Sequence, residues 1–148
     1  MTWVLIAHVG ATLAMTGLIW LIQCVHYPLF AQVGAEAFQD YHARHTQWIT
    51  PIVGPLMLVE LGTAFWLAQT PPAALPVWQI WTGLGLVIVI WASTALLQIP
   101  LHNSLGRGLD VEAIQKLVTG NWVRTIAWSV RSGLVLWWIQ LLVQESSF

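Results

Sequence analysis

Residues 26–48 read HYPLFAQVGAEAFQDYHARHTQW and separate two stretches of chain that are almost free of charge. This segment holds three of the five histidines of the 148-residue chain. Hydrophobic residues make up 57% of the sequence and charged residues 7%, whereas soluble domains carry about 25% charged residues. The composition therefore predicts an integral membrane protein, with this polar segment as a loop between two membrane spans.

Outward from this segment, the apolar stretches predict an all-α fold with four membrane-spanning helices of about 20 residues each. We expect one transmembrane domain, a four-helix bundle over residues 1–148. Pro28 and Pro100 are expected to end the first and third spans, because proline breaks helical hydrogen bonding. Short amphipathic helices are expected over residues 35–45 and 110–118, with Asp110 as the N-cap of the second. The expected spans cover about 3–25, 48–69, 77–99 and 122–142.

The two halves of the chain resemble each other. QCVHYPLF in the first half matches LLQIPLHN in the second, which pairs Pro28 with Pro100. Glu36–Gln39 likewise pairs with Glu112–Gln115, with GRGLD accounting for a four-residue insertion. Each half reads as span, proline, short helix and span. We interpret the pattern as two hairpins in a parallel repeat about an axis along the membrane normal, with a site where the repeats meet.

The basic residues indicate which side of the membrane each loop faces. Four of the five lie in or beside the two loops that follow the first and third spans, whereas the proline-rich turn and both termini have none. The positive-inside rule therefore predicts an inner or plasma membrane protein with these histidine-rich loops in the cytoplasm and both termini outside. The four residues are Arg44, Arg107, Lys116 and Arg124.

Four histidines are expected to meet at the cytoplasmic face: His26 ends the first span, His42 and His45 precede the second, and His102 ends the third. His42 and His45 are three residues apart, so they share one face of a helix. Imidazole is the commonest metal ligand in proteins. The pattern predicts a site for a transition metal ion (Fe, Cu or Zn) or for haem. The alternative is interfacial histidines that only bond to backbone and lipid head groups.

A second group of polar residues lies deeper. Glu60 and Arg131 fall within expected spans at similar depth, and a charge inside the membrane is a functional-site hypothesis by default. We predict that they form a pair that His8 touches. Asn121 and Arg124 share the inward face of the fourth span with Arg131. The candidate catalytic residues are Glu60, Asn121, Arg124 and Arg131, and His8 is a candidate cofactor-binding residue. The alternative is an ion pair that only fixes helix register.

The segments PLHNSLGRG and NWVRT resemble the anthrone-oxygenase-like family of small four-helix membrane proteins, through Pro100, Asn103, Leu105, Trp122 and Arg124. The resemblance covers the last third of the chain and implies oxygenation of a polycyclic, hydrophobic substrate. The histidine-rich first loop departs from that pattern. A fainter likeness links GLIWLIQCVHYPLF to small four-helix haem-dependent or copper-linked membrane proteins.

Three functions follow as hypotheses. The first is a membrane oxidoreductase or oxygenase with a histidine-bound metal and a lipophilic, aromatic or quinone-like substrate. The second is an ion or metal transporter or metal-handling protein, and the third is a structural membrane partner. Membrane lipids are expected partners, and a homo-oligomer is a candidate state. The net charge of −1 argues against nucleic-acid binding, and a single cysteine excludes an internal disulfide.

Overall fold

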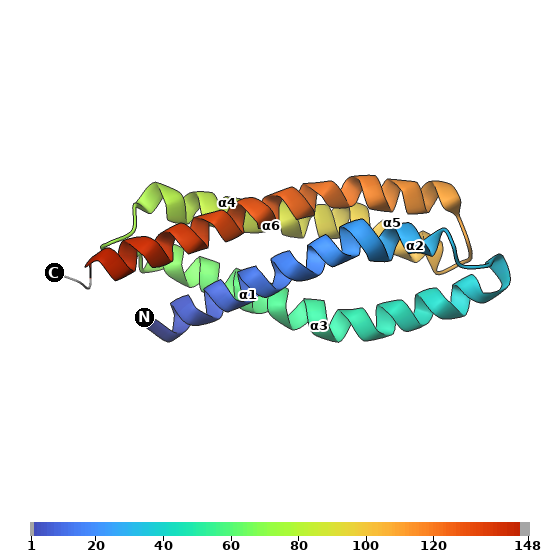
Figure 1. The fold of residues 1–148 in the computed structure, drawn as a ribbon, viewed down its shortest axis with the longest axis horizontal. Helices are drawn as coiled ribbons and strands as arrows, with labels where there is room; N and C mark the ends of the chain where they lie inside the picture. The colour runs from blue at the N-terminus through green and yellow to red at the C-terminus, as the bar shows by residue number, and fades with distance from the viewer. Residues whose placement is uncertain (1, 146–148) are drawn as a thin grey trace.

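The computed structural model describes residues 2–145, and in this range the chain is helical apart from its connecting loops. Four helical stretches are long and apolar enough to cross a membrane, which confirms the predicted all-α four-helix bundle. Both termini lie at one end of the bundle, and the loops after α2 and α5 lie at the other (Figure 1). The elements are α1 (Thr2–Leu21), η1 (Ile22–His26), α2 (Tyr27–Phe30), α3 (Ala35–Gln69), α4 (Val77–Ser93), η2 (Thr94–Gln98), α5 (Ile99–Leu105) and α6 (Val111–Glu145).

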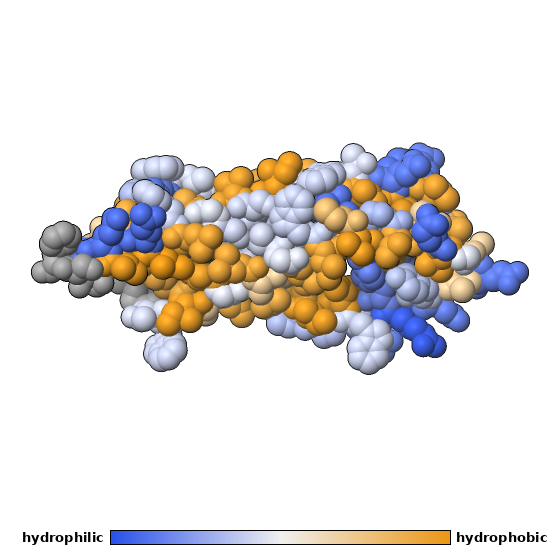
Figure 2. All heavy atoms as spheres, in the orientation of Figure 1, coloured by the Kyte–Doolittle hydropathy of each residue, from blue (hydrophilic) through white to orange (hydrophobic). Residues whose placement is uncertain are grey.

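The helices pack as a ring in which α1 and α4 each contact both α3 and α6. The lateral surface is apolar, with side chains such as Leu96 and Leu58 at 73% and 60% exposure. Figure 2 shows hydrophobic residues over the middle of the bundle and a group of hydrophilic residues at the end that carries the loops after α2 and α5. An apolar belt of this kind suits contact with lipid, since polar groups cannot be satisfied there.

The expected helix ends at Pro28 and Pro100 are wrong. Each proline follows a π-helical segment, η1 or η2, and the helix continues beyond it into α2 or α5. In the wider turn the amide of Tyr27 bonds to the carbonyl of Ile22, five residues back, and Ile99 bonds to Thr94 in the same way. The π turn accommodates the missing proline N–H without ending the helix.

The two short amphipathic helices are not separate elements. Residues 35–45 form the first turns of α3, and residues 111–118 form the first turns of α6. Pro51 and Pro55 lie inside α3, which remains one helix. Asp110 is the predicted N-cap of α6, and its Oδ1 accepts the amide of Ala113 at 3.0 Å.

Both halves share one architecture. Each begins with a 29-residue helical stretch and continues with a 35-residue helix. The π turns begin at Ile22 and Thr94, and the prolines follow at 28 and 100, so the spacing between equivalent positions is the same. The repeat inferred from the sequence therefore has a structural counterpart, and the shared π turns are its most specific feature.

Candidate functional site

The four histidines meet at the end of the bundle that carries the loops after α2 and α5. His26 Nε2 lies 2.7 Å from His45 Nδ1, and His42 Nε2 lies 2.9 Å from His102 Nδ1. The hydroxyl of Tyr27 lies 3.0 Å from the other ring nitrogen of His102. The rings of His45 and His102 stack with centroids 5.6 Å apart, which joins the two pairs. The predicted meeting is confirmed, and we call these five residues the histidine cluster.

Local structure explains how the cluster forms. His26 ends the η1 turn, which carries its ring toward α3, and His42 and His45 occupy one face of α3. Phe30 is fully buried and packs edge-on against the rings of His26 and His45. Its ring also contacts His42 and His102. Phe30 thus fixes the positions of all four imidazoles from one side.

The donor set has the chemistry of a metal site, since neutral imidazoles bind Fe, Cu and Zn. In a tetrahedral site with metal–nitrogen bonds of about 2.0–2.1 Å, two ligand nitrogens lie roughly 3.3 Å apart. The paired nitrogens, at 2.7 and 2.9 Å, are hydrogen-bonded to each other and lie closer together than this spacing. Within residues 2–145, however, no three histidine, cysteine or acidic side chains form a group arranged to hold an ion.

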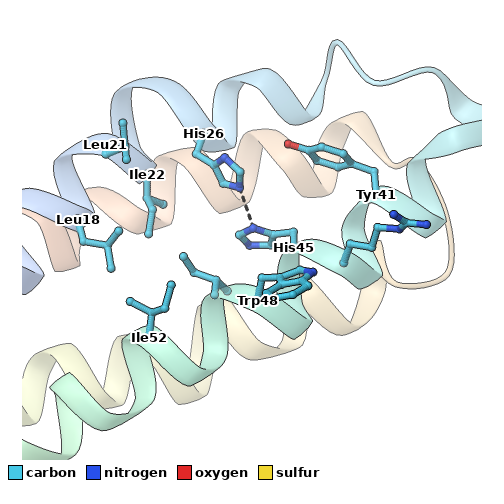
Figure 3. A pocket seen from close by; sticks show the side chains of 10 residues that line it. Leu18, Leu21, Ile22, His26, Tyr41, His45, Trp48 and Ile52 are labelled. Atoms are coloured by element: carbon cyan, nitrogen blue, oxygen red, sulfur yellow. Dashed lines mark hydrogen bonds between the residues drawn. The ribbon is translucent and has the colours of Figure 1, made fainter.

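A cavity of about 400 Å³ lies beside the cluster, between α1–η1 and α3. Figure 3 shows His26 and His45 facing each other at its wall, with Ile22 and Ile52 nearby and Trp48 on the α3 side. Most of the lining is aliphatic or aromatic, so the cavity suits an apolar group. The full lining is Leu18, Leu21, Ile22, His26, Tyr41, Arg44, His45, Trp48, Ile49 and Ile52.

A second cavity of about 400 Å³ lies along a neighbouring face of α3 and is also lined by α4, η2, α5 and α6. His45 lines both cavities, together with Ile22 and Ile49. The second cavity also exposes His102 and Tyr27 of the cluster. The cluster therefore stands between two spaces of ligand size, and one imidazole is reachable from either of them.

Of the four candidate catalytic residues, Arg124 lies in this region. It lines the second cavity, is 5% exposed, and its guanidinium lies 5.2 Å from the ring centroid of Trp128. Its polar neighbour is the hydroxyl of Tyr27. Asn121 does not line the cavity: its amide donates to Gln23 at 2.9 Å, so its side chain joins α6 to η1.

Glu60 and Arg131 form the predicted pair, with Arg131 Nε donating to Glu60 Oε1 at 2.9 Å. Thr12 donates to the same oxygen at 2.7 Å, and Trp128 Nε1 donates to Oε2 at 2.9 Å. His8 Nε2 lies 3.3 Å from Arg131 Nη2, as predicted. Both carboxylate oxygens have partners, which makes this a closed buried network.

The two groups are far apart. His42 and Glu60 both lie on α3, 18 residues apart, which corresponds to about 27 Å along a helix. His8 therefore belongs to the Glu60 network and not to the histidine cluster. The structure brings together the four predicted metal ligands with Arg124, and it places the remaining candidates elsewhere.

Sequence reasoning missed two polar residues at the site, Tyr27 and Gln98. Tyr27 directly follows His26, so its position next to a candidate ligand was a usable signal. Gln98 stands 72 residues after His26, the same spacing that relates Pro28 to Pro100. The repeat therefore places Gln98 at the position equivalent to a cluster histidine.

Comparisons of the chain with protein-family models, curated proteins and solved structures found no match. The resemblance to the anthrone-oxygenase-like family stays a prediction.

Proposed function

We propose that this protein is a membrane-embedded, metal-dependent oxidoreductase of the oxygenase type, acting on a lipophilic aromatic or quinone-like substrate beside the histidine cluster. The observation that supports the proposal is the position of His45. Its imidazole pairs with His26, stacks on His102 and lines both cavities. A metal-ligand residue type thus stands where an apolar molecule can reach it from either cavity.

The residues that would hold the ion are His26, His42, His45 and His102. Small ring rotations about the existing nitrogen pairs would give an ion two to four imidazole ligands, since these nitrogens already face one another. Bound there, Fe or Cu would supply one-electron chemistry, and Zn would polarise a carbonyl or hydroxyl group. Tyr27 acts on the cluster by holding one ring nitrogen of His102 through its hydroxyl. Such an outer partner fixes the orientation of a ligand ring.

The cavities favour a lipophilic substrate. Each has about 400 Å³, which falls within the range of small-molecule sites, about 300–1,000 Å³. The walls of the first cavity are mostly aliphatic and aromatic, and the second adds hydroxyl, amide and guanidinium side chains to an apolar lining. The substrate would enter from the lipid, and the apolar walls would exclude water from the cluster.

We place the cluster at the cytoplasmic face. Arg44, Arg107 and Lys116 are exposed at this end of the bundle. Arg124, the fourth basic residue near these loops, is buried and does not contribute to the surface charge. Three exposed basic residues at one end support this orientation through the positive-inside rule.

The Glu60–Arg131 pair supports the bundle in this proposal. Its oxygens are fully bonded and it lies about 27 Å from His42, so a direct part in chemistry at the cluster has no geometric support. A transport path through Glu60 is the competing proposal. In that case Glu60→Gln should stop ion flux in vesicles while metal content persists.

The first experiment is elemental analysis and absorption spectroscopy of protein purified in mild detergent. Wild type is compared with the double variant His42→Ala/His45→Ala, and His8→Ala serves as the matched control from the distant network. We expect a stoichiometric metal in wild type and in His8→Ala, and its loss in the double variant with the bundle still folded by circular dichroism. Absence of metal from wild type after reconstitution with Fe, Cu or Zn would overturn the proposal.

A further inference from the structure

The second cavity is lined by a buried cation, Arg124, which has no acidic partner within residues 2–145. Arg124 is 5% exposed, and its side chain lies against Trp128 and Tyr27. Neither of the two ion pairs in the described part of the chain includes it. Its Nε also has no hydrogen-bond partner there. A guanidinium in such a place is unfavourable unless an anion accompanies it.

Gln98 lines the same cavity. It is 2% exposed, and neither its amide nitrogen nor its amide oxygen has a hydrogen-bond partner within residues 2–145. Buried polar groups are almost always hydrogen-bonded, so two orphaned atoms on one side chain require an explanation. Both residues line the cavity, so a ligand there would provide partners for Gln98 and Arg124 once their side chains turn toward it.

The rest of the cavity suits an apolar body. Helices α3, α4 and α5 and the η1 turn contribute aliphatic, thioether and indole side chains to its walls, beside the threonines of α3 and η2. Its volume of about 400 Å³ admits a small ring system or a short acyl chain. The apolar lining residues are Ile22, Ile49, Val53, Met57, Trp91 and Ile99.

We propose that this cavity binds an amphiphile with an anionic, oxygen-bearing head, which pairs with Arg124 and bonds to the amide of Gln98. Carboxylate and phosphate oxygens match the planar fork of a guanidinium. The inference deepens the proposed function, since it gives the lipophilic substrate an acidic head and places it beside His45 and His102. The head group belongs to a free organic acid or to an anionic membrane lipid, which share this chemistry.

The first test measures binding of 2-naphthoate by isothermal titration calorimetry to EDTA-treated protein in a neutral detergent. The neutral alcohol 2-naphthalenemethanol has the same ring system and serves as the matched ligand. We expect wild type to bind the acid about 10-fold more tightly than the alcohol, because charged hydrogen bonds contribute this much. Arg124→Gln should lose the preference, and Arg107→Gln, at an exposed arginine, should keep it.

Two further variants make the test independent of how well Arg124→Gln folds. Arg124→Lys keeps the charge but removes the fork, and Gln98→Leu keeps the arginine but removes the amide. Each is expected to weaken binding of the acid several-fold without changing binding of the alcohol. Equal affinity of wild type for acid and alcohol, or acid binding that is unchanged in these variants, would overturn the inference.

Native mass spectrometry identifies the source of the head group. Protein is taken from vesicles that contain phosphatidylglycerol, with and without 2-naphthoate. A retained lipid that Arg124→Gln loses supports a lipid ligand, and 2-naphthoate bound without retained lipid supports a free acid. If neither the lipid nor 2-naphthoate binds, the inference is overturned. Because the protein is metal-free, a failed metal reconstitution leaves this result unaffected.

Discussion

Arg131 on α6 donates its Nε hydrogen to Oε1 of Glu60 on α3 at 2.9 Å, and each side chain is 1% exposed. The same network includes Thr12 on α1 and the backbone carbonyl of Gly83 on α4, which accepts Arg131 Nη1. One buried pair therefore connects all four helices of the ring. In lipid, where apolar burial does not hold helices together, such polar contacts are a main source of specific packing.

Removal of the acid should weaken the bundle strongly. In Glu60→Ala the guanidinium of Arg131 stays buried without its counter-charge, and we expect the free energy of unfolding to fall by about 3–5 kcal/mol. Denaturant-induced unfolding in detergent, followed by circular dichroism, measures this change.

The control is Glu36→Ala, an exposed acid in the first turn of the same helix. It should alter the unfolding free energy by less than about 1 kcal/mol. The double variant Glu60→Leu/Arg131→Leu should regain most of the loss, because it leaves no unpaired charge. A Glu60→Ala protein as stable as wild type would rule out a structural role for the pair.

The indole of Trp128 should contribute through its hydrogen bond as well as its packing. Its Nε1 donates to Glu60 Oε2 at 2.9 Å. Trp128→Phe keeps most of the ring but removes the donor, and we expect a loss of about 1–3 kcal/mol in unfolding free energy. Trp122→Phe on the same helix, at a 41% exposed position, is the control and should have little effect. If both variants lose the same unfolding free energy, the loss comes from the smaller ring and not from the missing hydrogen bond.

The π turn before Pro28 should control the position of His26. Pro28→Ala restores an amide hydrogen, which permits a regular α-helix in place of the wider turn. We expect the ring of His26 to rotate away from His45. Histidine ¹⁵N NMR on selectively labelled protein in detergent follows the bond between these two imidazoles.

The matched control for that variant is Pro55→Ala, at a proline inside the continuous helix α3. It should leave the His26 signals unchanged. Unaltered His26 signals in Pro28→Ala would show that the π turn forms without the proline, and that its extra residue is held by the packing of neighbouring helices.

Filling the second cavity should block its ligand without unfolding the protein. Gly54 lines this cavity, and no atom lies within 4 Å of the position that a Cβ would take. Gly54→Phe is expected to weaken 2-naphthoate binding at least about 10-fold in calorimetry. The melting temperature should not fall, since phenylalanine is a better helix former than glycine.

Gly62→Phe is the control for this variant. Gly62 lies on the same helix with the same open space around its Cβ position, and it is exposed outside both cavities. Binding in Gly62→Phe should equal that of wild type. Equal weakening in the two variants would place the ligand elsewhere on α3.

Composition and the placement of charges were sufficient to predict the class of fold and several of the candidate residues. Several uncharged stretches are long enough to cross a membrane as helices. A helical bundle satisfies the backbone hydrogen bonds of such stretches in lipid. The rarity of ionisable residues made Glu60 and Arg131 stand out, and their similar depth was enough to predict the pair. The four histidines could be assigned to one end because span counting alone fixes which loops share a membrane face.

How these residues contact one another depends on the packing of the folded helices. Inside helices that are apolar all round, periodicity does not say which face turns inward, so the second cavity and the orphaned amide of Gln98 could not be read from the chain. The π turns were also hidden, because proline predicts a helix end unless neighbouring helices stabilise a wider turn. Asn121 bonds to Gln23, whereas Arg124 lines the second cavity. Which side chain faces which neighbour depends on how α6 is rotated about its own axis, and the packing of α6 against α1 and α4 sets this rotation.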